Sequence, residues 1–250
     1  MPNFKIEAIT VSKSANFESC ADKEHYFSQF SPLNISTYNL KARLGTISHE
    51  IIEKYLNNSK LKIDRKSVEK TFNEIVKEKK YDFDKEYLNR REGTEFIYRN
   101  LTVIKKLKAF IDENNFEISV EHDYGKTSPF YGKADIIFRT DQKSIVVDYK
   151  TGKIFNNENR LDDSINKQLL AYCFLELEEI GSNKDILAYV LNKSGDFVEI
   201  ENCDKDYIYK YSERVKKLID QINEKYTISD EKNFYCNECQ TEWVGRISNS

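Results

Sequence analysis

Apolar residues recur at helical spacing through the first part of the chain. Across residues 37–56 they return at steps of three and four, which traces one stripe of an amphipathic helix. Similar patterns predict helices at residues 67–80 and 84–114, with Gly93 as a candidate break in the second of these. We therefore expect this part of the chain to be largely helical.

After residue 115 the pattern changes its period. Short segments rich in β-branched residues and bounded by turn residues predict strands, and longer segments with helical spacing of apolar residues predict helices. Gly181 is a candidate C-cap for the helix at 161–180. The predicted order is strands at 116–124, 133–140 and 143–150, a helix at 161–180, strands at 185–192 and 196–200, and a helix at 205–226. This order predicts a mixed α/β fold, with helices flanking a central mixed sheet.

Composition narrows the class of protein. The 250 residues carry 39 lysines and arginines against 42 aspartates and glutamates, a net charge of -3, which excludes a basic nucleic-acid coat protein but not an enzyme with local basic patches. The 16 tyrosines and 15 phenylalanines exclude intrinsic disorder. The longest apolar run, residues 169–175, is too short to span a membrane, no secretory signal is recognisable, and five cysteines are an odd number for a disulfide framework. We expect a cytoplasmic protein without a membrane partner.

The strands at 133–140 and 143–150 carry the most informative acidic residues. If the polar turn between them closes a hairpin with Asp141 and Gln142 in the loop, Asp135 lies directly opposite Asp148. Like charges that face each other across a ladder destabilise it, so a divalent cation bound between the two carboxylates is the simplest explanation. The alternative is a pair of solvated charges on an amphipathic hairpin.

Lys150 lies two residues after Asp148 and therefore projects from the same face of the strand. A lysine beside metal-bound carboxylates can orient a water molecule or stabilise the charge that develops on a phosphate. Hard oxygen ligands favour Mg²⁺ or Mn²⁺ over Zn²⁺. The turn Thr151-Gly152 that closes the segment adds weight to the metal-site interpretation.

Four short motifs occur in order along the chain. They are Gly45-Thr-Ile-Ser-His49, Gly132-Lys-Ala-Asp135, Asp148-Tyr-Lys150-Thr-Gly and Gln168-Leu-Leu-Ala-Tyr172. With these motifs the chain resembles the PD-(D/E)XK nuclease superfamily, and within it the RecB-like exonucleases, which include the AddB nuclease domain and the CRISPR-associated RecB-like exonucleases. The resemblance implies a restriction-endonuclease-like core at about residues 35–200 of one domain spanning 1–250, whose terminal segments pack together as a helical subdomain.

The resemblance also implies roles for individual residues. Asp135 and Asp148 would ligate the metal together with the main-chain carbonyl of Tyr149, and His49 would contribute a further ligand. Lys150 would activate or position the attacking water. These five residues form the predicted catalytic and metal site, with Mg²⁺ or Mn²⁺ as the cofactor.

Other side chains are assigned less directly. Gln168 and Tyr172 lie one helical turn apart and would contact the active-site lysine or the DNA strand, although Tyr172 could equally be a core aromatic residue. Glu121 could be an upstream acidic ligand or part of a solvated strand face. Gly45, one turn before His49, leaves room for a ligand to approach.

Cysteines raise the prospect of a second cofactor. Several RecB-like proteins hold an iron–sulfur cluster with one cysteine near the N-terminus and three near the C-terminus, and the matching residues here are Cys20, Cys236 and Cys239. No fourth cysteine follows Cys239 in the sequence. The cluster is therefore absent, or another residue completes it, or the fourth cysteine lies in a segment beyond the end of this sequence. His25 could instead complete a Cys₃His zinc site. Cys173 and Cys203 are expected to be buried as small hydrophobic residues.

The function predicted from these features is metal-dependent hydrolysis of DNA phosphodiester bonds. The resemblance implies an exonuclease that acts on single-stranded or frayed ends, in DNA repair and recombination or in phage or CRISPR-type defence, with protein partners in such a complex. A structure-specific or RNA-directed nuclease within a complex is a further interpretation. The alternative from another class is a catalytically silent nucleic-acid-binding or assembly module with the same fold.

Overall fold

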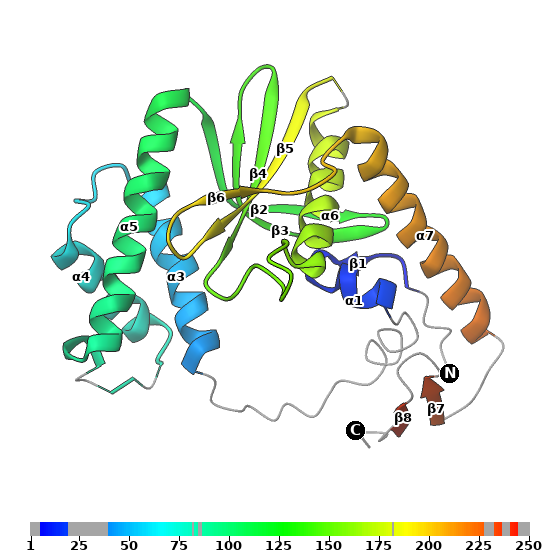
Figure 1. The fold of residues 1–250 in the computed structure, drawn as a ribbon, viewed down its shortest axis with the longest axis horizontal. Coiled ribbons are helices and arrows are strands. Elements are labelled where there is room, and N and C mark those ends of the chain that lie inside the picture. Colours follow the sequence, from blue (N-terminus) through cyan, green and yellow to red (C-terminus); the bar gives the residue numbers. More distant parts are fainter. Residues whose placement is uncertain are drawn as a thin grey trace.

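The computed structural model describes residues 6–19, 40–81, 83–84, 87–181, 183–227, 233–236 and 241–244. Helices flank both faces of a six-stranded mixed sheet, which confirms the predicted fold class (Figure 1). In the described ranges no helix is both long enough and apolar enough to cross a membrane.

The predicted elements occur in the predicted order, and the structure adds short elements near both ends of the chain that the sequence pattern did not predict. The helices are α1 (Ser14–Ser19), α3 (Leu40–Asn57), α4 (Arg65–Glu78), α5 (Arg91–Asn114), α6 (Asp163–Ile180) and α7 (Lys205–Thr227), with 3-10 turns η1 (Val11–Lys13) and η2 (Tyr87–Asn89). The strands are β1 (Ile9–Thr10), β2 (Glu117–Thr127), β3 (Phe130–Arg139), β4 (Lys143–Lys150), β5 (Asp185–Asn192) and β6 (Phe197–Glu199), and a separate hairpin of β7 (Asn233–Cys236) and β8 (Thr241–Val244).

Helix ends follow the local chemistry of the sequence. The side chain of Asp64 accepts a hydrogen bond from the amide of Ser67 and begins α4, and Asp162 does the same for α6 through the amide of Ser164. Gly181, with a positive φ of 80°, ends α6 as predicted.

Several predicted boundaries shift by a few residues, and two of the differences are informative. The helix expected at 84–114 begins only at Arg91, and Gly93 does not break it. A Cβ atom at Gly93 would lie 2.1 Å from the carbonyl oxygen of Tyr87, so this glycine allows η2 to pack directly on α5. The strands β2 and β3 also extend further toward each other than expected, because the polar sequence of their turn conceals the pairing of Thr127 with Phe130.

The β3–β4 hairpin has the predicted register. Ile136 pairs with Val147 and Phe138 pairs with Ile145, which is the alignment that sets Asp135 against Asp148. The backbone ladder stops at the Ile136 pair, one residue before the two aspartates. The strands therefore separate at the point where the acidic residues meet.

Strand β3 changes its partner along one edge. β2 pairs with nearly the whole length of β3, so β1 and β4 must share the opposite edge. On that edge β1 pairs with Phe130 and Tyr131, and β4 pairs with the residues from Ile136 onward. Residues 132–135 lie between the two, without a strand partner there among the described residues. This interruption leaves a gap in the sheet at Asp135.

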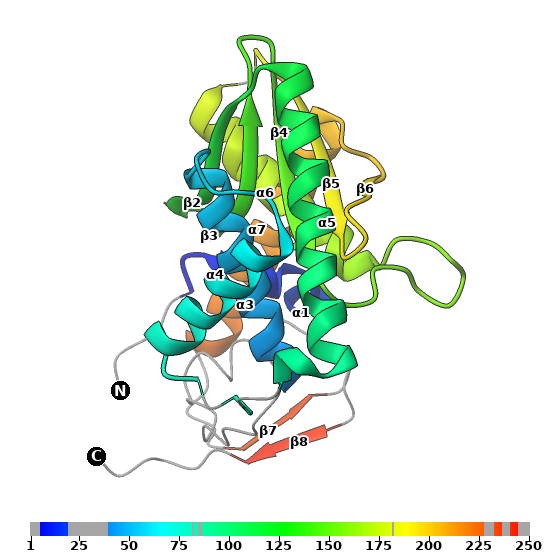
Figure 2. The ribbon, with the colours of Figure 1, turned by 90° about the vertical axis from the view of Figure 1, so that its left-hand side faces the viewer.

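The sheet separates two apolar cores. Ile145 and Val147 of β4 belong to the core that includes α3, α4 and α5, and Val146 between them belongs to the core that includes α6 and α7. Figures 1 and 2 show these two groups of helices on opposite sides of the sheet. This alternation is the period of two expected for a strand. Both faces of β4 are thus buried, which fixes its register and with it the position of the residues at its end.

An ionic network lies in the core on the α6 side of the sheet, at the end of β3 and β4 that is farther from Asp135 and Asp148. Glu176 of α6 is fully buried, and its carboxylate accepts hydrogen bonds from Arg139, Ser144 and Tyr124 at 2.6–2.9 Å. Burial alone would raise the pKa of Glu176, but these donors outweigh it and leave the pKa lowered. The network joins α6 to β2, β3 and β4.

Replacing Glu176 with glutamine should lower the free energy of unfolding at pH 7 by about 3 kcal/mol. This is the lower end of the range for breaking a buried ion pair, because Arg139 keeps its ion pair with Glu179. Urea denaturation of the variant and the wild type measures the difference. Glu179→Gln is the matched control, and its half-exposed carboxylate should contribute less than about 1 kcal/mol.

The effect of Glu176 should depend on pH. Because its folded-state pKa lies below the ordinary value of 4.5, the carboxylate stabilises the protein fully above that pH, and the contribution is lost as the pH falls through the lowered pKa. The difference between wild type and Glu176→Gln should therefore shrink below pH 4.5. A difference that is small at pH 7, or that grows in acid, would contradict the role of this network.

Strand β2 contains a backbone irregularity at Glu121. Its neighbours Val120 and His122 pair with Ile136 and Ala134, so Glu121 lies opposite Asp135, yet its φ is 52°. A left-handed conformation costs a residue with a Cβ atom on the order of 1 kcal/mol, and asparagine tolerates it better than most residues.

Glu121→Asn and Glu121→Gln both remove the carboxylate, so their difference in stability isolates the backbone conformation. We expect the asparagine variant to be more stable by on the order of 1 kcal/mol, because asparagine adopts a positive φ more readily. Thermal or urea denaturation checks this, and equal stability of the two variants would show that the conformation carries no strain.

Candidate active site

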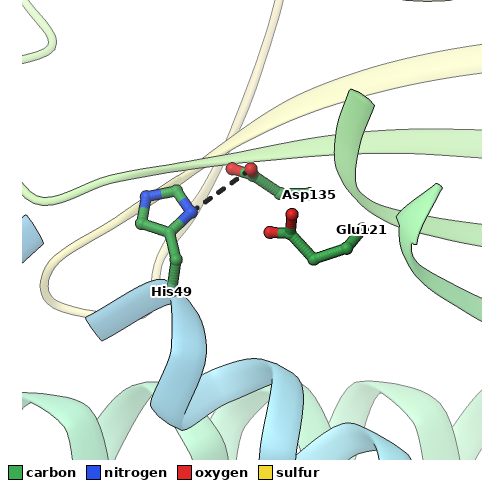
Figure 3. Close-up of side chains that lie close together, drawn as sticks. All are labelled: His49, Glu121 and Asp135. Atoms are coloured by element: carbon green, nitrogen blue, oxygen red, sulfur yellow. Dashed lines mark ion pairs between the residues drawn. The ribbon is translucent and has the colours of Figure 1, made fainter. Parts of the chain in front are cut away.

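The gap in the edge of β3 brings together side chains from three elements. His49 of α3, Glu121 of β2 and Asp135 of β3 point toward one another (Figure 3). Each offers one ligand atom, and these atoms all lie within 4.8 Å of one another. His49 Nδ1 is 3.2 Å from Asp135 Oδ1. In the structure, Glu121 thus lies where an upstream acidic ligand is expected, rather than on a remote solvated face.

Asp135 is held in place by the backbone of β4. The amide of Tyr149 donates a hydrogen bond of 2.7 Å to Asp135 Oδ2, so the carboxylate takes up a donor next to the end of the β3–β4 ladder. The ring of Tyr149 packs beside the ring of His49, with 5.1 Å between the centroids. Tyr149 therefore orients both partners of the His49–Asp135 contact.

A second group lies on the α6 side of the gap. Lys150 Nζ is 2.8 Å from Asp148 Oδ2, which confirms that the two side chains share a face of β4. Gln168 of α6 contacts both: its Oε1 accepts from Lys150 at 2.9 Å and its Nε2 donates to Asp148 Oδ1 at 3.2 Å. Gln168 thus contacts Lys150, while the catalytic role of that lysine stays a prediction.

The pKa values of Asp148 and His49 are both raised, in part because negative charge is concentrated at the site. Asp148 is 3% exposed, and its burial, followed by the nearby charge of Asp135, raises its pKa to about 6, although Lys150 opposes the shift. Burial alone would lower the pKa of His49, but the hydrogen bond and the charge of Asp135 outweigh it, so the pKa is raised. A bound cation would relieve both effects.

The donor set fits a divalent cation. Carboxylates with one imidazole suit Mg²⁺ or Mn²⁺, and the buried Oδ2 of Asp148 accepts no hydrogen bond even though it lies close to Lys150. Asp148 itself is directed toward Lys150 and Gln168 and is not part of the His49–Glu121–Asp135 group. Its role as a ligand, and that of the Tyr149 carbonyl, stay predictions.

Tyr172 lies beside the site but within the core. Its side chain is buried, its hydroxyl donates to the carbonyl oxygen of Lys133 at 2.7 Å, and burial raises its pKa. This placement matches the core alternative rather than a contact with Lys150. Gly45 also differs from expectation: a Cβ atom there would lie 3.3 Å from Thr151 Oγ1, so the loop after β4 takes the space that was expected for a ligand.

One charged residue of the site was not singled out in the sequence. Lys133 Nζ forms an ion pair of 2.9 Å with Glu121 Oε2. The sequence could have indicated Lys133, because it lies two residues before Asp135 within the Gly132–Asp135 motif. The pair lies at a polar pocket of about 710 Å³ that also opens onto His49 and is lined largely by α3 and α4.

The predicted second cofactor site falls mostly outside the described residues. Cys20, His25 and Cys239 lie there, and for Cys236 the structure gives only the backbone of β7. Of the other two cysteines, Cys173 is buried as predicted, and its Sγ lies 3.8 Å from that of the partly buried Cys203.

Comparisons with known proteins bear on this geometry. The chain matches the family model of the PD-(D/E)XK nuclease superfamily over residues 8–244. No curated protein matches it. A solved structure described as the crystal structure of SSO0001 is similar with 18% sequence identity and a TM-score of 0.27, over 70% of this chain and 85% of that chain. The family model alone covers most of the sequence, including every residue of the site, and the chain therefore belongs to the PD-(D/E)XK nuclease superfamily.

Proposed function

We propose that the chain is a metal-dependent nuclease that hydrolyses phosphodiester bonds of DNA. The observation that carries this proposal is the adjacency of a His49–Glu121–Asp135 ligand group to the ion pair of the buried Asp148 with the partly exposed Lys150. A merely structural arrangement has no need to bring three carboxylates and a histidine together at one place.

Each side chain has a definite task in such a reaction. A divalent cation, when bound by His49, Glu121 and Asp135, supplies positive charge to the phosphate under attack. Among the described residues Lys150 donates one hydrogen bond, to Gln168, and forms an ion pair with Asp148, so its ammonium group keeps a donor that can orient a water molecule or a phosphate oxygen. Attack by that water on phosphorus breaks the bond to one sugar oxygen.

The finer assignment rests on the motif pattern. The histidine of Gly45-Thr-Ile-Ser-His49 and the glutamine of Gln168-Leu-Leu-Ala-Tyr172 are the features typical of the RecB-like branch, and here both side chains reach the site. They support an exonuclease acting on single-stranded or frayed DNA ends, in a repair or defence complex. A catalytically silent binding module is opposed by the complete set of Asp135, Asp148 and Lys150.

Digestion of end-labelled single- and double-stranded DNA tests this function. Cleavage should require Mg²⁺ or Mn²⁺, stop in EDTA, and fall at least about 100-fold in Lys150→Ala, because the variant loses the donor that faces the reacting phosphate or water. Lys70→Ala, an exposed lysine in another ion pair with a glutamate, is the matched control and should cut normally. An inert wild type that still shifts DNA in a gel would establish the binding module instead.

Metal binding has its own readout in thermal stability. Mn²⁺ at about 100 times its dissociation constant should stabilise the folded wild type by about 2.7 kcal/mol, and Asp135→Asn should abolish most of this gain because it removes a ligand oxygen from the centre of the group. Asp112→Asn removes an exposed carboxylate from α5 and should leave the gain intact. A full Mn²⁺ effect in Asp135→Asn would contradict this metal site.

A further inference from the structure

Two residues that line the polar pocket form an ion pair that the proposed reaction does not use. Lys133 Nζ and Glu121 Oε2 are 2.9 Å apart, and Glu121 is at the same time a member of the metal-ligating group. The side chain of Lys133 is 51% exposed, whereas that of Lys150 is 28% exposed. Lys133 is therefore the more accessible of the two cations at the site.

We propose that Lys133 is a phosphate-binding residue, and that Glu121 restrains it until a divalent cation draws the Glu121 carboxylate away. The ligand is a phosphate of a nucleic-acid backbone adjacent to the metal group. This inference rests on the proposed nuclease function and identifies a residue with which that site binds its substrate.

The position of Lys133 is set by rigid neighbours. Its carbonyl oxygen accepts the hydroxyl of Tyr172, and a Cβ atom at Gly132 would lie 3.1 Å from Val11 and 3.4 Å from the ring of Tyr172. The backbone around Lys133 is thus fixed against α6 and η1, while its half-exposed side chain lines the pocket. A lysine anchored in this way presents its charge at a defined place.

The surrounding charges make Lys133 distinctive. The pocket is lined by five glutamates and three lysines, so most of its surface repels a phosphate. Lys54 and Lys79 are paired with Glu78 and Glu50, which are not members of the metal group. Only the partner of Lys133 would be recruited by a cation.

An exchange of partners follows from this arrangement. A carboxylate that turns its charge toward a divalent cation interacts less with a lysine, so metal binding weakens the Glu121–Lys133 pair. The released ammonium group then attracts a phosphate, and the phosphate favours the released state in return. Metal and nucleic acid should therefore bind with positive coupling, which is reciprocal by thermodynamic linkage.

Fluorescence anisotropy with a labelled single-stranded oligonucleotide tests the exchange without catalysis, in EDTA and again in Ca²⁺. In EDTA, Glu121→Gln should tighten binding several-fold because Lys133 loses its restraint. Lys133→Gln should weaken binding in Ca²⁺ several-fold and reduce the salt slope by about one. The double variant should bind like Lys133→Gln in EDTA.

The double variant separates release of Lys133 from a simple loss of negative charge. If Glu121→Gln tightens binding equally with and without Lys133, or if Lys133→Gln binds like wild type in Ca²⁺, the inference is overturned. Lys70→Gln removes a lysine from an ion pair outside the metal group and should change neither affinity nor salt slope by as much.

The outcome also separates this inference from the proposed function. Wild-type cleavage that Lys150→Ala abolishes, combined with unchanged binding by Lys133→Gln, leaves the nuclease standing and removes Lys133 from it. A wild type that neither binds nor cuts DNA overturns both.

Discussion

The site depends on one hydrogen bond, from the backbone amide of Tyr149 to the carboxylate of Asp135. Repulsion between Asp135 and Asp148 would otherwise drive the ends of β3 and β4 apart, since both carboxylates lie where the ladder stops. The amide holds one oxygen of Asp135 and leaves the other directed at His49. Without that bond the ligand group would lose its central member, and the buried Asp148 would lose the neighbour that shapes its ionisation.

Helix α6 connects this site to the stability of the whole sheet. Gln168, Tyr172 and Glu176 follow one another at one-turn spacing along its inner face, and each bonds a different part of the strands below. At one end Gln168 contacts Lys150 and Asp148, and at the other Glu176 forms an ion pair with the partly buried Arg139. A displacement of α6 would therefore disturb the site and the ionic network together.

Most of the fold could be predicted because the spacing of apolar residues along the chain matches the faces of helices and strands that are buried. The register of the β3–β4 hairpin and the shared face of Asp148 and Lys150 follow from a period of two, which both buried faces of β4 enforce. The sequence left Glu121 between two interpretations, because only the pairing of β2 with β3 sets it opposite Asp135. The roles of Gly93 and Gly45 were equally hidden, because each depends on a segment that only the folded chain brings near.

The interrupted edge of β3 has a consequence for solubility. An open stretch of strand edge offers unpaired backbone groups to strands of other molecules, and proteins usually protect such edges against aggregation. Here side chains provide that protection. The hydroxyl of Tyr172 donates a hydrogen bond to the carbonyl oxygen of Lys133, and the charged side chains of Lys133 and Asp135 belong to the unpaired stretch itself. The residues around the break in the sheet thus keep it from becoming a template for association.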